Sequence, residues 1–169
     1  MDVIRGAVSA LAGGRAGEPV GAIKIVDPSP ANWLYVNYNV DEELIRVSPS
    51  GWVEPAAMQS YRWADDRTLE VAVRDGNVFP DGERLTAATV KRAFDELMRW
   101  SAPHPPGTHF NNDPRTTCEV TGAMTVRFHY PEPDGLALGK LRAMHVMSTR
   151  FWEEVGFGYA RTQSGEGHW

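Results

Sequence analysis

Histidine is the side chain best suited to metal binding or to proton transfer near neutral pH. The chain has five, at His104, His109, His129, His145 and His168. None of them shows the paired spacing that places two imidazoles on one zinc ion. The sequence therefore predicts no metal site, and we expect no cofactor.

Other groups that could support catalysis are also poorly arranged. Adjacent carboxylates occur at 65–66 and 153–154, but neighbouring residues point apart on a helix or strand, so neither pair predicts a catalytic dyad. The single cysteine, Cys118, excludes an internal disulfide and lies in an expected strand, which favours a buried, inert thiol over a nucleophile. No nucleophile elbow, phosphate loop or His-Glu-x-x-His motif occurs. We therefore expect a protein that is not an enzyme.

Composition narrows the class of protein further. The chain has 169 residues, 42% of them hydrophobic, and a net charge of −5. An acidic balance argues against nucleic acid as a partner, because phosphate binding needs clustered Lys and Arg. No apolar stretch approaches the roughly 20 residues of a membrane span. Residues 1–20 do not resemble a secretory leader, since Asp2 is acidic and Arg5 interrupts the apolar run.

Two segments alternate apolar with polar residues, which is typical of half-buried strands: Leu69–Val73 and Met124–Tyr130. The segment Cys118–Val120 is expected to pair with the second of these through a turn at residues 121–122. Further short strands are expected at residues 23–26, 52–57, 61–63 and 144–147.

Helix signals lie between these strands. Ser29-Pro30 followed by Trp33, Val36, Val40 and Leu44 at helical spacing predicts a helix near residues 30–46. Thr86 is a good N-cap for a helix over residues 87–100. Shorter helices are expected after Asp134 and, with Ser148 as the cap, over residues 151–155.

A series of motifs in chain order resembles the family 5 extracellular solute-binding proteins, the peptide and nickel class. The strongest is Val73–Gly82, which is similar to the family's Leu-Arg-Asp-Gly-Val-Lys-Phe-x-Asp-Gly signature, with Gly76 and Gly82 supplying two Asp-Gly turns. The other matching segments are residues 27–28, 44–51, 53–56, 63–68, 85–90 and 165–169.

The resemblance implies an α+β fold with a mixed sheet and flanking helices, like the N-terminal lobe of a type II periplasmic-binding-protein-like fold. Residues 1–22 would be an N-terminal segment with a Gly-rich linker, and residues 23–169 would form the lobe. The implied function is capture of a peptide-like ligand for an ABC importer, outside the cell or in the periplasm. The alternative is a truncated, leaderless cytoplasmic protein that reuses the lobe as a sensor, an assembly partner or a biosynthetic enzyme.

The resemblance also suggests ligand-binding residues, because the family binds its ligand in a cleft between two lobes. The candidates are Trp33, Tyr35, Asn37, Tyr38, His145, His168 and Trp169. A surface helix with Trp33 in the core, and a core position for His145, are the alternatives. The histidine spacing gives the nickel branch of the family no support.

One lobe would supply one wall of the cleft. Its aromatic side chains would then form an exposed apolar patch, which monomeric proteins rarely leave uncovered. We therefore expect self-association, or a second chain covering that face, and weak binding of free peptides by the isolated chain.

Overall fold

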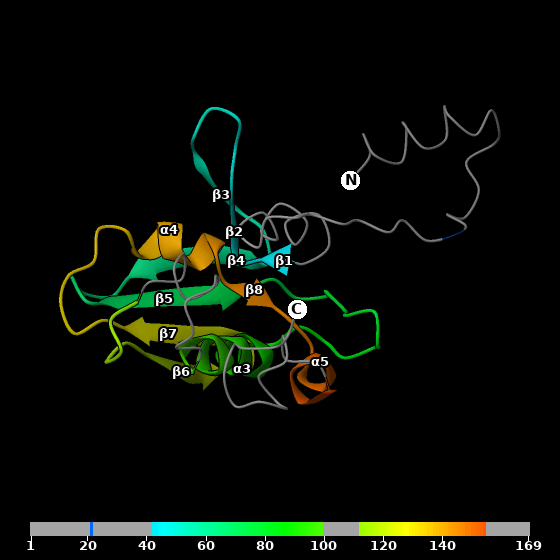
Figure 1. Cartoon of the computed structure of the whole chain (residues 1–169). Coiled ribbons are helices and arrows are strands. Elements are labelled where there is room, and N and C mark those ends of the chain that lie inside the picture. Colours follow the sequence, from blue (N-terminus) through cyan, green and yellow to red (C-terminus); the bar gives the residue numbers. More distant parts are fainter. Residues whose placement is uncertain (1–20, 22–41, 100–111, 155–169) are drawn as a thin grey trace, which may run out of the picture.

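The structure is a computed structural model, which describes residue 21 and residues 42–99 and 112–154 (Figure 1). These residues form short strands and three helices. In chain order they are β1 (Glu42–Glu43), β2 (Ile45–Val47), β3 (Val53–Pro55), β4 (Met58–Trp63), β5 (Thr68–Val73), α3 (Ala87–Met98), β6 (Thr117–Gly122), β7 (Thr125–His129), α4 (Ala137–Arg142), β8 (His145–Val146) and α5 (Thr149–Glu154).

The centre of the fold is a four-stranded sheet with the order β4-β5-β7-β6. Val71 in β5 lies opposite Tyr61 in β4 and opposite Val126 in β7, which itself lies opposite Val120 in β6. Helix α3 covers one face of this sheet and contacts β6 and β7 (Figure 1). Two small strand pairs, β1–β8 and β2–β3, complete the described part, in which every strand pair is antiparallel.

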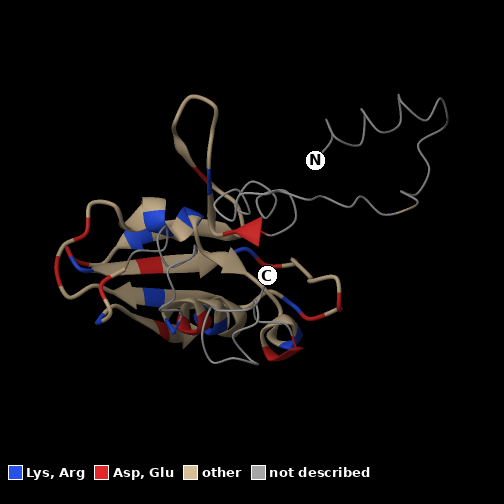
Figure 2. Cartoon of the chain, in the orientation of Figure 1, with Lys and Arg blue, Asp and Glu red and all other residues tan. Residues whose placement is uncertain are grey.

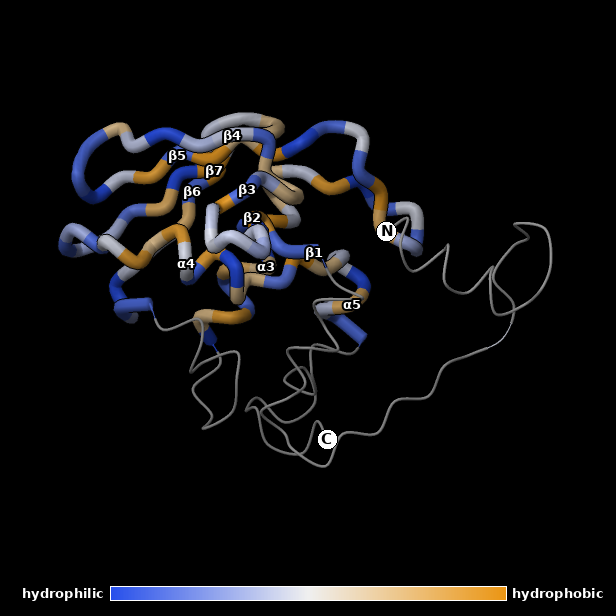
Figure 3. Tube along the Cα trace, turned by 90° about the horizontal axis from the view of Figure 1, so that it is seen from above, coloured by the Kyte–Doolittle hydropathy of each residue, from blue (hydrophilic) through white to orange (hydrophobic). Residues whose placement is uncertain are grey.

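The alternating pattern of the strands produces the core. Leu69, Val71 and Val73 of β5 are buried, while the residues between them are only half-buried. Figure 3 shows the same alternation of hydrophobic and hydrophilic positions along β5 and β7. Phe128 of β7 packs against Phe94 of α3 with their ring centroids 5.5 Å apart. Burying a side chain of this size contributes about 1.5–3 kcal/mol, so this layer holds the helix on the sheet.

Helix α3 begins where the sequence predicts. The Thr86 hydroxyl accepts a hydrogen bond from the backbone nitrogen of Thr89 at 3.4 Å, and the Thr89 hydroxyl accepts one from the backbone nitrogen of Thr86 at 2.9 Å. This reciprocal capping box satisfies two donors that the first turn leaves without partners. The predicted Thr86 cap is confirmed, and the helix extends to Met98.

The opposite face of the sheet is polar. Arg62, Glu70, Arg127 and Glu119 occupy successive strands at facing positions, so the sign of the charge alternates across the sheet (Figure 2). Glu70 accepts hydrogen bonds from Arg127 at 2.8 Å and from Arg62 at 2.7 Å. The hydrogen bond from Arg127, and to a lesser extent that from Arg62, holds the pKa of Glu70 below its ordinary value. Facing opposite charges stabilise such a sheet without apolar packing on that side.

The fold class is confirmed as α+β with flanking helices, and so are the strands over residues 69–73 and 124–130. The strand that contains Cys118 does pair with β7, but the predicted turn at residues 121–122 is wrong by two residues. Strand β6 runs to Gly122, and the turn lies at residues 123–124. A register irregularity between Val120 and Gly122 lengthens β6, which a purely alternating pattern does not reveal.

The predicted helix over residues 30–46 is wrong at its C-terminal end, and residues 30–41 lie outside the described part. Glu42–Glu43 pairs with β8, and Ile45–Val47 pairs with β3. The helical spacing from Val36 to Leu44 reflects local sequence only and carries no information about distant strand partners. Pairing with these strands overrides the local helix propensity here. The predicted domain boundary between residues 22 and 23 also lies outside the described residues and stays a prediction.

Candidate functional site

The loop between β5 and α3 carries the two Asp-Gly turns. Gly76 and Gly82 have φ values of 88° and 91°, in the region that favours glycine. The Asp75 carboxylate accepts hydrogen bonds from the Gly76 backbone nitrogen at 2.8 Å and from the Arg84 guanidinium at 3.0 Å. The same carboxylate therefore bonds to residues at both ends of the loop.

This loop is also bonded to a helix much later in the chain. Glu83 accepts hydrogen bonds from the backbone nitrogen and the hydroxyl of Thr149, the first residue of α5. The Ser148 hydroxyl accepts a bond from the backbone nitrogen of Phe151 at 3.2 Å, which confirms its predicted capping role. A hydrogen bond from Ser148 is the main cause that lowers the pKa of Asp81. The loop thus supplies carboxylates to the start of α5.

Beside this loop, β1 and β8 place two titratable residues opposite each other. Glu43 faces His145 in the register of the pair, and both are buried. Burial raises the pKa of Glu43, and burial lowers the pKa of His145 to about 4. The imidazole is therefore neutral at physiological pH, which suits a buried position.

The predicted site residues fall mainly outside the described part of the chain: Trp33, Tyr35, Asn37, Tyr38, His168 and Trp169. Only His145 is described, and its side chain has 0% exposure in the core. The core position that was the alternative for this residue is therefore observed. A ligand-binding role for any of the seven stays a prediction.

The chain enters the described fold at Glu42 and leaves it at Glu154. Strands β1 and β8 and helix α5 lie at the same end of the sheet (Figure 1). The stretches that contain most of the predicted ligand-binding residues therefore connect to one end of the four-stranded sheet, next to the loop of the two Asp-Gly turns.

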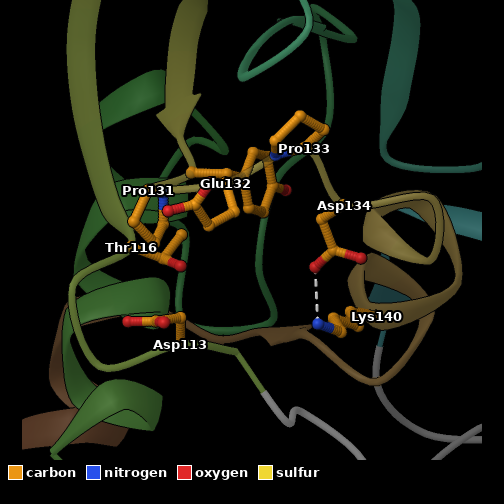
Figure 4. Close-up of a pocket in the computed structure, with 8 residues that line it drawn as sticks. Asp113, Thr116, Pro131, Glu132, Pro133, Asp134 and Lys140 are labelled. Carbon is orange, nitrogen blue, oxygen red and sulfur yellow. Dashed lines mark hydrogen bonds and ion pairs between the residues drawn. The ribbon is translucent and has the colours of Figure 1, made fainter.

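A small hollow lies at the opposite end of the sheet, where β7 ends (Figure 4). Its cavity volume is about 150 Å³, and side chains of both charges line it. No pattern in the sequence predicts this hollow, because Pro131–Pro133 indicates only the end of a strand.

Among residues 42–99 and 112–154, no group of three or more His, Cys, Asp or Glu side chains could hold a metal ion. Within the same ranges, no helix is both long enough and apolar enough to cross a membrane. The predicted burial of Cys118 is confirmed, and this burial raises the pKa of its thiol to about 12. Its inertness stays a prediction.

The sequence profile of the bacterial extracellular solute-binding proteins, family 5 (middle part), matches residues 53–164. The chain therefore belongs to this family.

Individual relatives agree with this assignment. The nickel-binding protein NikA of Staphylococcus aureus is 32% identical over 66 residues, which are 39% of this chain and 13% of NikA. The structure of the pheromone receptor PrgZ, which describes its mode of peptide binding, superposes with a TM-score of 0.65 at 20% identity, over 83% of this chain and 30% of PrgZ. The structure of Haemophilus influenzae OppA in complex with RPPGFSPFR gives a TM-score of 0.63 at 17% identity, over 77% and 29% of the two chains.

These structural similarities establish the fold. The chain spans less than a third of the length of each of these relatives.

Proposed function

We propose that this chain is part of a binding protein that captures a peptide-like solute and delivers it to an ABC importer. The observation that carries the proposal is the family match over residues 53–164, which includes the loop of the two Asp-Gly turns. The choice of a peptide-like ligand is supported by the fold shared with PrgZ and OppA, whose structures were described with peptide binding and with RPPGFSPFR respectively.

A nickel complex is the second candidate ligand. It is supported by the identity of 32% to the nickel-binding protein NikA. The similarity to NikA covers only 13% of that protein. We favour the peptide-like ligand because the superpositions with PrgZ and OppA cover 83% and 77% of this chain.

The ligand would lie against Trp33, Tyr35, Asn37, Tyr38, His168 and Trp169, as the family resemblance suggests, whereas the fully buried His145 would not touch it. Binding sites are commonly concave and rich in aromatic side chains. A second lobe, or another copy of this chain, would cover that face. The proposed place of action is extracellular or periplasmic, with an ABC permease as partner.

The test is to purify the complete gene product that contains this chain and to identify what it carries by mass spectrometry. Isothermal titration calorimetry with a mixed peptide library and with a nickel–histidine complex then measures affinity. Co-purified peptides and binding of library peptides would support the proposal. Binding of the nickel complex alone would establish the second candidate, and binding of neither would refute both.

A further inference from the structure

The hollow at the end of β7 has its own chemistry. It lies between the segment before β6, the residues that follow β7, and α4. Thr116 and Asp113 lie on one side, and Asp134 and Lys140 lie on the other (Figure 4). The polar residues that line it are Asp113, Thr116, Tyr130, Glu132, Asp134 and Lys140.

Two of the three carboxylates already have partners. Asp113 forms an ion pair with the Arg115 guanidinium at 2.8 Å, and hydrogen bonds from Arg115 lower the pKa of Asp113 to about 2. Asp134 forms an ion pair with Lys140, the one cation among the residues that line the hollow. These two ion pairs hold the side chains on both sides of the hollow in place, and the charges of Asp113 and Asp134 are balanced by their partners.

Two polar groups lack such partners. The side-chain oxygen of Thr116 is buried and has no hydrogen-bond partner among the described residues, and the residue is only 4% exposed. Figure 4 shows the Thr116 oxygen directed toward the space in front of Lys140 and Asp134. A buried hydroxyl without a partner costs about 1–3 kcal/mol, so its presence in a native fold requires an explanation. The Glu132 carboxylate, which is exposed, also forms no hydrogen bond or ion pair within the described residues and acts on Arg115 only at longer range.

We propose that this hollow binds an ammonium group, which donates hydrogen bonds to the Thr116 hydroxyl and the Glu132 carboxylate. With Asp113 paired to Arg115 and Asp134 paired to Lys140, the Glu132 carboxylate leaves one net negative charge, which favours a cation over an anion. An ammonium has three donors and no acceptor, which matches the two groups that remain. Pro131 and Pro133 add apolar surface for a short alkyl stem.

An ammonium of this kind has two sources, a free alkylamine or a lysine side chain of a peptide or protein. The volume of about 150 Å³ accommodates either of them. The site lies at the other end of the sheet from the loop of the two Asp-Gly turns, and the inference does not depend on the proposed function.

The test titrates the full chain with propylamine, with Nα-acetyl-lysine methylamide and with neutral 1-propanol, and follows backbone amide shifts by NMR. Ligands of so few atoms are expected to bind with millimolar dissociation constants. Thr116→Val keeps the shape and removes the hydroxyl, and Glu132→Gln removes the exposed charge. Glu54→Gln, at an exposed position on β3, is the matched control.

Both amines, or one of them, should shift the amides of residues 112–116 and 130–134, and 1-propanol should not. Each pocket variant should weaken binding at least tenfold, while Glu54→Gln leaves it unchanged. A preference for propylamine identifies a free amine as the source, and a preference for the lysine derivative identifies a side chain. The absence of amine binding, or equal binding by wild type and both pocket variants, would overturn the proposal. Thermal unfolding of Thr116→Val shows whether the variant is folded. If it is folded and binds amines normally, the Thr116 hydroxyl has a structural role only.

Discussion

Glu83 and Thr149 are 66 positions apart in sequence, yet the Glu83 carboxylate accepts bonds from the Thr149 backbone nitrogen at 2.6 Å and from its hydroxyl at 2.7 Å. The first donor is one of the groups that the start of a helix leaves without a partner. A residue in the loop of the Asp-Gly turns therefore caps α5. The residue that directly follows the family motif Val73–Gly82 therefore has a structural role, which is to hold the last described helix against the sheet.

Glu83→Gln should loosen this connection. The amide keeps the shape of the side chain but loses the charge, and hydrogen bonds to charged groups are worth about 1.5–3 kcal/mol. We expect the free energy of unfolding to fall by about 1–2 kcal/mol in urea titrations. Glu153→Gln on α5, where the side chain is exposed, is the control and should change it little. An equal effect of the two variants would contradict the role given to Glu83.

Hydrogen exchange separates this local effect from a global one. In Glu83→Gln, the amides of α5 should exchange faster, while those of β5 and β7 should change only as much as the global stability does. Uniform acceleration over all described residues would mean that Glu83 contributes to global stability without capping α5.

Helix α3 depends on its capping box. Thr86→Ala removes the hydroxyl that accepts from Thr89 and should lower the free energy of unfolding by about 1 kcal/mol. Thr86→Ser keeps an oxygen at the same place and should retain most of the stability. Thermal and urea unfolding of the three proteins would measure this order, and a serine variant as unstable as the alanine variant would contradict it.

The parts of the fold that the sequence predicts correctly are those with local causes. The Thr86 cap, the alternation of Leu69, Val71 and Val73, and the two glycines at positive φ all depend on residues close in the chain. Their physical basis, helix capping and half-burial of strands, acts within a few residues. Motif order then identified the family, which no single element could have done.

The parts that could not be predicted depend on contacts between distant segments. Ile45 became a strand residue because β3 pairs with it, and Thr149 gained a cap from a loop far earlier in the chain. The hollow at the end of β7 combines residues from around positions 113, 132 and 140, which share no periodic pattern. No spacing rule brings such residues together, so only the folded chain reveals the site.

Cys118 offers a sensitive test of core packing, because it is the one cysteine in the chain. With burial raising its pKa to about 12, the thiolate needed for reaction is scarce at mildly alkaline pH. A thiol reagent such as DTNB should therefore react very slowly with the folded chain and rapidly in urea. In a Cys118→Ala background, a Val120→Cys variant on the same strand, where the side chain is 41% exposed, should react rapidly without urea. Rapid labelling of native Cys118 would contradict the buried position.

The last prediction concerns the buried pair Glu43 and His145, whose effects on stability have opposite signs. The folded pKa of His145 is about 4, below its ordinary value of 6.5, so its contribution to stability is present above 6.5 and is lost as the pH falls toward 4. The folded pKa of Glu43 is raised above 4.5, so its contribution is present below 4.5 and is lost as the pH rises through the folded pKa. As the pH falls from about 7 to about 5, His145 lowers the free energy of unfolding by about 2 kcal/mol, and uptake of a proton by Glu43 acts in the opposite direction.

Urea unfolding across this pH range separates the two contributions. His145→Gln should make the dependence of unfolding free energy on pH shallower, and Glu43→Gln should make it steeper, whatever each variant does to stability at neutral pH. The slope of unfolding free energy against pH tests the buried, neutral imidazole directly. An exposed histidine would have nearly the same pKa in the folded and unfolded states, so its proton uptake would not contribute to the slope. A wild-type slope that His145→Gln leaves unchanged would mean that this imidazole is not held neutral by the fold.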